Sequence, residues 1–205
     1  MTEHVSNENY TTSAIRPGEP DPTPEKPVGE YLSDVVTNEL VNAEYKKLVL
    51  RVPDKALTAY AGQFFHLLCP SPDGAEVWMR RPMSVYRVNR INSQLEFLYK
   101  CEGRGTQGMA MLEAGQTFNL SGPLGVGFSL DPSWKNIIVL GRGVGLATLA
   151  PLSQLASEGG IGVTAILSAR RTDLVMSQEL FQALGADTVT GVDEDGTSDV
   201  KNVKL

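Results

Sequence analysis

The hydrophobic pattern of this chain changes abruptly at Pro132, and this change limits the possible folds more than any other feature. Between Tyr31 and Leu130, short runs of alternating apolar residues are separated by Gly, Pro, Asn and Asp. A period of two is typical of antiparallel strands that bury one face. After Pro132, continuous apolar runs alternate with segments of helical spacing. We therefore expect an antiparallel β module followed by an α/β module.

The first module is expected to be a closed barrel or sandwich. Leu48, Leu50 and Val52 alternate with Lys47, Val49 and Arg51 and predict one strand. Further strands are predicted at 64–68, 83–88, 95–99 and 117–120, with one short helix at 107–112. Several short strands at this spacing favour a small β-barrel.

The second module reads strand, helix, strand, helix, strand. The run 136–140 is continuous and β-branched, as expected of a strand that is covered on both faces. Helices are predicted at 146–155 and 177–184, and strands at 162–167 and 188–192. This order predicts a parallel sheet with right-handed connections. Three strands are few for an open dinucleotide-binding sheet, so we expect this domain to be incomplete at Leu205.

Three regions follow from these patterns. Residues 1–29 are polar, contain five prolines from Pro17 to Pro27, and are expected to form a flexible tail that flavin binding can do without. Residues 30–131 form the barrel, and residues 132–205 form the α/β domain.

Composition narrows the class of partner. The net charge of -6 disfavours nucleic acid, since no cluster of Lys and Arg is large enough to neutralise a phosphate backbone. No apolar stretch reaches the roughly 18 residues of a membrane span. Cys69 and Cys101 are the two cysteines, and they form neither a disulfide framework nor a metal site. We therefore expect a cytoplasmic protein without a metal site or a membrane contact.

The glycine-rich turn Gly141-Arg142-Gly143-Val144-Gly145 follows a predicted buried strand and precedes a predicted helix. This is the position of a phosphate-binding turn, where helix amides and the helix dipole favour an anion. Tight backbone packing explains such a turn equally well. Ser168 and Arg170 follow the second parallel strand and could accept a ribose 2′-phosphate, but a solvated basic loop is the more frequent explanation of such residues.

The run from Met79 to Tyr86 carries a second candidate site. Pro82 keeps the preceding residue extended, which would direct the Arg81 guanidinium outward as a two-pronged donor for a diphosphate. Ser84 lies on the same side of the strand as Pro82 and could offer a hydroxyl or an amide to a ring. From the residues alone, a charged β-edge without any ligand is the better explanation.

Six short motifs follow one another along the chain: Gly62-Gln63-Phe64, Arg81-Pro82-Met83-Ser84, Leu98-Tyr99-Lys100, Gly103-Arg104-Gly105-Thr106, Gly122-Pro123-Leu124-Gly125 and Gly141-Arg142-Gly143-Val144-Gly145. In their order and spacing they resemble the ferredoxin reductase superfamily, and within it the electron-transfer subunits of dihydroorotate dehydrogenase. The resemblance covers almost everything after the tail.

The resemblance implies which residues bind which cofactor. FAD would be held by Arg81, Pro82, Met83, Ser84, Leu98, Tyr99, Lys100, Gly105 and Thr106. Thr106 would cap the short helix, and Tyr99 would offer an aromatic face. NAD(P) would be bound by Gly141, Gly143, Val144 and Gly145, with Ser168 and Arg170 influencing the choice of dinucleotide. No catalytic side chain is expected, because the flavin performs the chemistry.

The chain also departs from the family. Arg142 stands where a further glycine is usual, and Cys69 and Cys101 do not match the cysteines that hold a 2Fe-2S cluster. We expect such a cluster only if a missing carboxyl-terminal segment or a partner supplies it. The function that the resemblance implies is electron transfer between NAD(P)(H) and a catalytic dehydrogenase subunit through FAD, in pyrimidine metabolism. The alternative is a degenerate or truncated member that acts as a non-catalytic interaction or regulatory module.

Overall fold

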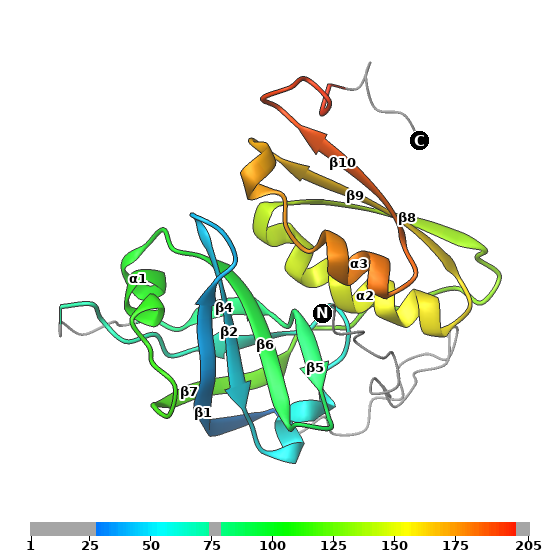
Figure 1. Cartoon of the computed structure of the whole chain (residues 1–205). Coiled ribbons are helices and arrows are strands. Elements are labelled where there is room, and N and C mark those ends of the chain that lie inside the picture. Colours follow the sequence, from blue (N-terminus) through cyan, green and yellow to red (C-terminus); the bar gives the residue numbers. More distant parts are fainter. Residues whose placement is uncertain (1–27, 74–78, 200–205) are drawn as a thin grey trace, which may run out of the picture.

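The computed structural model describes residues 28–73 and 79–199, and these form two modules that pack against each other (Figure 1). Residues 1–27, which include almost all of the predicted tail, lie outside the described residues. The modules are a curled antiparallel sheet and a three-stranded parallel sheet with helices. The predicted fold class is thereby confirmed.

The first module contains seven strands in the order β4-β3-β7-β1-β2-β6-β5, and all of its strand pairs are antiparallel. The sheet curls into a half-barrel in which β4 contacts β6. Its elements are β1 (Gly29–Leu40), β2 (Tyr45–Arg51), η2 (Asp54–Thr58), β3 (Phe64–Leu67), β4 (Arg81–Ser84), β5 (Arg87–Asn89), β6 (Gln94–Lys100), α1 (Arg104–Ala110) and β7 (Thr117–Leu124).

The barrel core follows directly from the alternation in the sequence. Leu95 and Phe97 on β6 point inward, and the ring of Phe97 meets that of Phe65 edge-on. Each fully buried side chain of this size contributes about 1.5–3 kcal/mol to folding. Tyr31 and Val35 show the same alternation on β1, which is the longest strand and which the sequence analysis did not assign individually.

The second module has the predicted order of elements. These are β8 (Asn136–Arg142), η3 (Gly143–Gly145), α2 (Leu146–Glu158), β9 (Gly162–Ala169), η4 (Thr172–Leu174), α3 (Gln178–Ala183) and β10 (Asp187–Val192). The strands are parallel and lie in the order β10-β9-β8. Within residues 28–73 and 79–199, no helix is both long enough and apolar enough to cross a membrane.

The expectation that the strand at 136–140 is covered on both faces is wrong for the described part of the chain. Val139 is buried, whereas Ile138 and Leu140 are 62% and 67% exposed. The reason is that α2 packs on β8 and β9, and α3 packs on β10 and on α2, so both helices cover the same face of the sheet. The opposite face carries no described helix.

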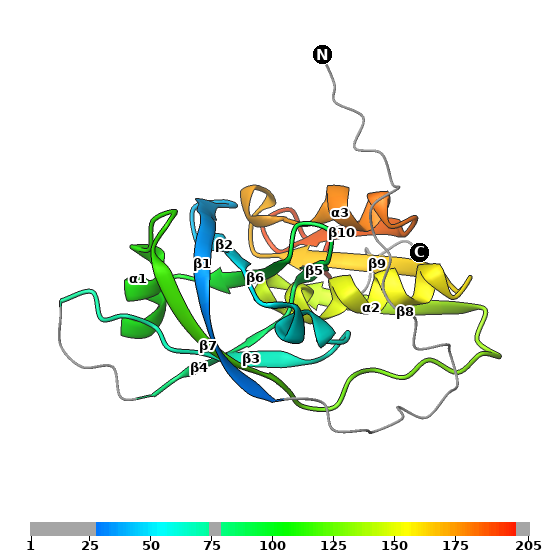
Figure 2. The same cartoon turned by 90° about the horizontal axis from the view of Figure 1, so that it is seen from below.

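The helical layer lies between the parallel sheet and the outside of the barrel, as both views show (Figures 1 and 2). Tyr86 and Leu98 project from the barrel into a second apolar core that includes Val139 and Leu146. The Tyr86 hydroxyl crosses the boundary and donates a hydrogen bond of 2.9 Å to Ser177 Oγ. The two modules are therefore joined by a continuous apolar contact with a polar link.

Candidate cofactor-binding site

The Arg-Pro-x-Ser element and the start of α1 meet in space. An ideal Cβ placed on Gly105 would lie 3.0 Å from Arg81 Nε, so the Arg81 side chain packs directly over this glycine. One Arg81 nitrogen, Nη1, donates to the Met79 carbonyl oxygen at 2.6 Å. The neighbouring Arg80 instead donates to Glu30 and Asn119. Arg81 is therefore the arginine of this pair that reaches the glycine element.

The helix α1 begins earlier than predicted, which changes the role of Thr106. Gly103 is its N-cap, and Thr106 occupies the third helical position. Thr106 Oγ1 accepts hydrogen bonds of 3.0 Å from the N–H groups of Glu102 and Gly103. Thr106 is therefore not the N-cap residue, but its side chain does cap the helix: the hydroxyl reaches back to the N-cap backbone as the N3 residue of a capping box. The first amides of α1 have no carbonyl partner within the helix.

The Leu-Tyr-Lys element divides between three environments. Tyr99 is fully buried in the barrel, and its hydroxyl donates to Asn38 Oδ1 at 2.8 Å. Burial raises the pKa of Tyr99 well above its ordinary value. The expectation that its ring faces a cofactor was therefore wrong, since alternation turns this residue inward. Leu98 faces the α/β module, and Lys100 lies 3.5 Å from Glu44 and 3.3 Å from Glu102.

The Ser84 side chain lies at the boundary between the modules. Thr148, on α2, donates a hydrogen bond of 2.9 Å to Ser84 Oγ. Met83, the residue before it, packs against the barrel core, and Pro82 is exposed opposite His66. The motif serine is thereby held against the first helix of the α/β module.

The glycine turn is closed on one side and open on the other. Gly143 has φ +55°, and an ideal Cβ on it would lie 2.5 Å from Tyr45 Oη. Gly145 has no heavy atom within 4 Å of its ideal Cβ position, and Val144 is exposed. At Gly141, the Leu146 side chain fills the space that a Cβ would occupy. Any dinucleotide phosphate would therefore approach at Val144 and Gly145, next to the start of α2.

Arg142 lies across the carboxyl ends of the parallel strands. Its Nη1 donates to Ser168 Oγ at 3.0 Å and to Asp193 Oδ1 at 3.1 Å, and its Nη2 donates to Asp193 Oδ2 at 2.5 Å. These hydrogen bonds from Arg142, with one from Ser198, lower the pKa of Asp193 to about 2. Arg142 therefore points away from the glycine turn towards β10.

Arg170 and Arg171 are likewise paired. Arg170 Nη2 donates to both Glu44 oxygens, at 2.8 and 2.9 Å, and Arg171 forms a two-pronged pair with Asp173. Four residues that make these contacts were not predicted: Glu44, Tyr45, Thr148 and Asp193. Asp193 had a detectable signal, because it directly follows the third parallel strand. Glu44 and Tyr45 had none, since they reach the site from a distant hairpin. Thr148 lies on the predicted helix after the turn, but no sequence signal indicated its contact with Ser84.

The residues fit FAD in their donor chemistry. A guanidinium over a glycine, the first amides of a helix and a hydroxyl at the module boundary are the groups that bind a diphosphate and a polar ring. The described residues contain no group of three or more His, Cys, Asp or Glu side chains that could hold a metal ion. Cys69 is buried, and burial raises the pKa of its thiol to about 11.

A cavity of about 890 Å³ lies between the barrel and the α3 side of the second module. It is lined by Lys47 and Leu98 from the barrel and by Ser177 and Glu179 next to and on α3. Of the predicted site residues, only Leu98 lines it. The cavity therefore lies apart from Arg81, Ser84 and the glycine turn, and we do not place the flavin there.

Sequence comparison relates this chain to electron-transfer subunits. It is 32% identical over 134 residues to "Dihydroorotate dehydrogenase B (NAD(+)), electron transfer subunit" of Lysinibacillus sphaericus, a match that covers 64% of this chain and 51% of that protein. The protein of the same name in Bacillus mycoides is 34% identical, with the same coverage. The chain thus spans about half the length of the curated relatives it matches. No family model matches the chain.

Solved structures share the fold. The NADH-dependent reduced ferredoxin-NADP oxidoreductase has a TM-score of 0.68 and 24% identity, covering 78% of this chain and 59% of that chain. The ferredoxin reductase of carbazole 1,9a-dioxygenase has a TM-score of 0.69 and 20% identity, covering 82% and 51%. These structures show that the chain shares the fold of these reductases, as the resemblance in the sequence had implied.

Proposed function

We propose that this chain, which has the ferredoxin reductase-like fold and related sequence, binds FAD on its barrel and transfers electrons between NAD(P)(H) and a partner redox subunit. The observation that carries this proposal is the packing of Arg81 over Gly105, because it brings two distant motifs into one donor cluster. The names of the sequence relatives support the electron-transfer role. FAD would supply the hydride and single-electron chemistry.

The chain's own residues would position the reactants. Arg81 and the first amides of α1 would bind the diphosphate of FAD, and Ser84 would face its ring from the end of β4. The backbone at Val144 and Gly145 would bind the dinucleotide, because it is the open part of the turn. Hydride transfer requires reacting atoms within about 3–3.5 Å, which a site at the boundary of two packed modules can provide while excluding water.

The partner in this proposal is a catalytic dehydrogenase subunit, as the names of the relatives indicate for those proteins. The substrate of that subunit, a place in pyrimidine metabolism and a cytoplasmic location are parts of the same proposal. A 2Fe-2S cluster would have to come from a partner or from residues outside this chain, because two cysteines cannot supply its usual four thiolates.

The proposal is tested by reconstituting the chain with FAD and titrating it with NADH without oxygen. We expect stoichiometric flavin absorbance that bleaches as NADH is added. Absence of flavin binding would contradict the proposal. Flavin that binds tightly but is not reduced by NADH or NADPH would favour the second candidate, a non-catalytic interaction or regulatory module. The packing of Tyr45 Oη on Gly143 supports that candidate, because it closes part of the turn.

A further inference from the structure

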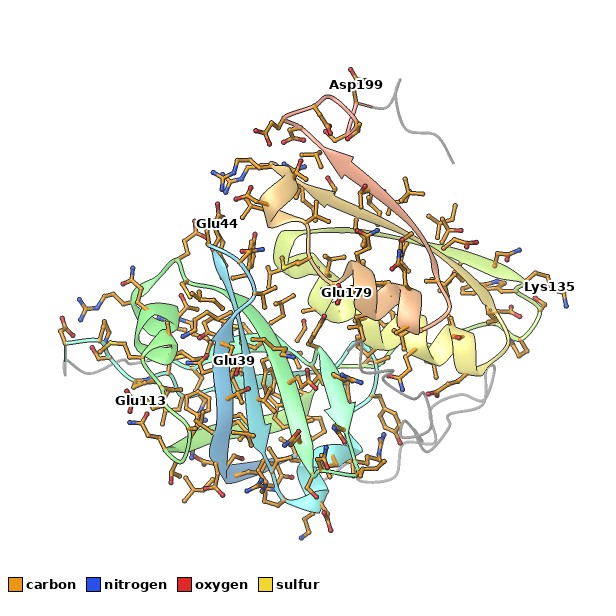
Figure 3. The ribbon with its side chains drawn as sticks, in the orientation of Figure 1. Glu39, Glu44, Glu113, Lys135, Glu179 and Asp199 are labelled. Carbon is orange, nitrogen blue, oxygen red and sulfur yellow. The ribbon has the colours of Figure 1, made fainter. Side chains whose placement is uncertain are left out.

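The hairpin between β1 and β2 places one carboxylate at the boundary of the two modules. Asn42 Oδ1 accepts hydrogen bonds from the N–H groups of Glu44 at 3.0 Å and Tyr45 at 3.1 Å. The Glu44 carbonyl oxygen accepts from the Cys101 N–H at 3.1 Å, which ties the hairpin to the end of β6. Figure 3 shows Glu44 at the tip of this hairpin, next to the α/β module. Its backbone position is therefore fixed by the barrel.

The Glu44 carboxylate joins one cation from each module. It accepts from Arg170 Nη2 at 2.8 and 2.9 Å, and Lys100 Nζ lies 3.5 Å away. Arg170 directly follows β9, where the adenosine ribose of a bound dinucleotide is expected. The one arginine that was predicted to meet a 2′-phosphate is thus already engaged by a carboxylate of the barrel.

The other arginines at the carboxyl ends of β8 and β9 are engaged too. Arg142 is paired with Asp193, and Arg171 with Asp173. Glu194 and Asp195 follow Asp193 and add further acidic groups after β10. A phosphate monoester at this edge would bring about -1.5 to -2 charges at pH 7 and would have to displace a carboxylate. A free ribose 2′-hydroxyl brings no charge and displaces none.

We infer that Glu44 is a specificity-determining residue that makes the site accept NAD(H) in preference to NADP(H), by holding Arg170 and placing a negative charge beside the 2′-position. This inference rests on the proposed dinucleotide site. It assigns the selectivity to a residue of the FAD-binding barrel rather than to the α/β domain.

The test compares Glu44→Gln with a matched control, Glu102→Gln, which also removes a carboxylate partner of Lys100 but none of Arg170. Binding of NADH, NADPH, 5′-ADP and 2′,5′-ADP to the full chain is measured by calorimetry with bound FAD that has been reduced beforehand, so that hydride transfer adds no heat. In Glu44→Gln, the ratio of NADH affinity to NADPH affinity should fall about three- to tenfold. The affinity for 2′,5′-ADP should rise relative to that for 5′-ADP by the same factor. Glu102→Gln should keep the affinity ratios of the wild type. In the double variant Glu44→Gln/Arg170→Ala, the increased affinity for NADPH and 2′,5′-ADP should be lost again.

The outcomes separate two kinds of failure. Binding of NADH and 5′-ADP with an unchanged NADPH ratio in Glu44→Gln would overturn the role of Glu44 and leave the dinucleotide site standing. Absence of NADH and 5′-ADP binding in the wild-type chain would overturn the site and the inference together. Thermal unfolding verifies that each variant folds, and Glu44→Ser replaces Glu44→Gln if the latter does not.

Discussion

Thr148 Oγ1 donates a hydrogen bond of 2.9 Å to Ser84 Oγ, which links the first helix of the α/β module to the serine of the Arg-Pro-x-Ser element. The serine hydroxyl has one donor and two acceptor positions, so this bond leaves it able to donate to a flavin. This hydrogen bond therefore separates two roles of Ser84, the observed role in joining the modules and the proposed role in binding the cofactor.

Variants at the two positions should distinguish these roles. Thr148→Val removes the hydrogen bond to Ser84 and should lower the free energy of unfolding by about 0.5–1.5 kcal/mol without weakening FAD binding. Ser84→Ala should lose the same stability and also weaken FAD binding about fivefold, because a neutral hydrogen bond is worth about 1 kcal/mol. Urea unfolding and flavin titration measure both quantities. A loss of FAD affinity in Thr148→Val equal to that in Ser84→Ala would show that Ser84 only joins the modules.

Arg81 and Arg80 form a matched pair for testing the diphosphate contact. Arg81→Ala should weaken FAD binding by about 1.5–3 kcal/mol, or roughly one to two decades in Kd, because a charge-assisted contact is lost. Arg80→Ala removes an ion pair with Glu30 at 2.6 Å on the barrel but should leave the FAD Kd unchanged. Flavin fluorescence titration measures the FAD Kd of both variants. Equal flavin affinity in the two variants would contradict the assignment of Arg81.

The fold was largely predictable because its signals are local. The alternation in Leu95–Tyr99 and the continuous run at 136–140 each identify a strand without any knowledge of the partner strands. The exposure of Ile138 and Leu140 could not be predicted in this way, since it depends on which face the helices cover.

Of the candidate site, only the residues within the sequence motifs could be predicted. Arg81 and Gly105 were both named and lie together, but Tyr99 was given the wrong orientation. Strand alternation would have corrected Tyr99, because Leu95 and Phe97 on the same face are core residues. Glu44 and Tyr45 could not be found, because their roles arise from contacts more than ninety positions away in the chain, on Arg170 and Gly143.

The Tyr86 hydroxyl should make stability depend on alkaline pH. Burial raises its pKa to about 12 in the folded protein, against an ordinary value of 10. The contribution of this hydroxyl to the free energy of unfolding is therefore complete below pH 10 and is lost as pH rises towards about 12. The reason is that Tyr86 loses its proton at a lower pH in the unfolded chain than in the folded protein. Each pH unit in this window costs about 1.4 kcal/mol.

The variant Tyr86→Phe lacks this titration. At pH 7 it should be about 1 kcal/mol less stable than the wild type, because Ser177 Oγ loses its donor. At pH 11 the difference should vanish, and above that pH the variant should be the more stable protein. Guanidinium unfolding at several pH values measures this. A constant difference from pH 7 to 12 would contradict the raised pKa.

The glycines of the turn should differ sharply in their tolerance of alanine. Gly143 has φ +55° and faces Tyr45 Oη, so Gly143→Ala should cost about 1–2 kcal/mol for the left-handed backbone and a further cost for displacing the tyrosine. Adding Tyr45→Phe to Gly143→Ala should recover the cost of displacing the tyrosine but not the cost of the left-handed backbone.

Gly145 has φ -57° and open space at its Cβ position, so Gly145→Ala should leave the free energy of unfolding unchanged or slightly raised. If the dinucleotide approaches at this open side, the added methyl group should nevertheless weaken NADH binding. Unfolding and NADH titration of the three variants together test the geometry of the turn, and unchanged NADH affinity in Gly145→Ala would place the dinucleotide elsewhere.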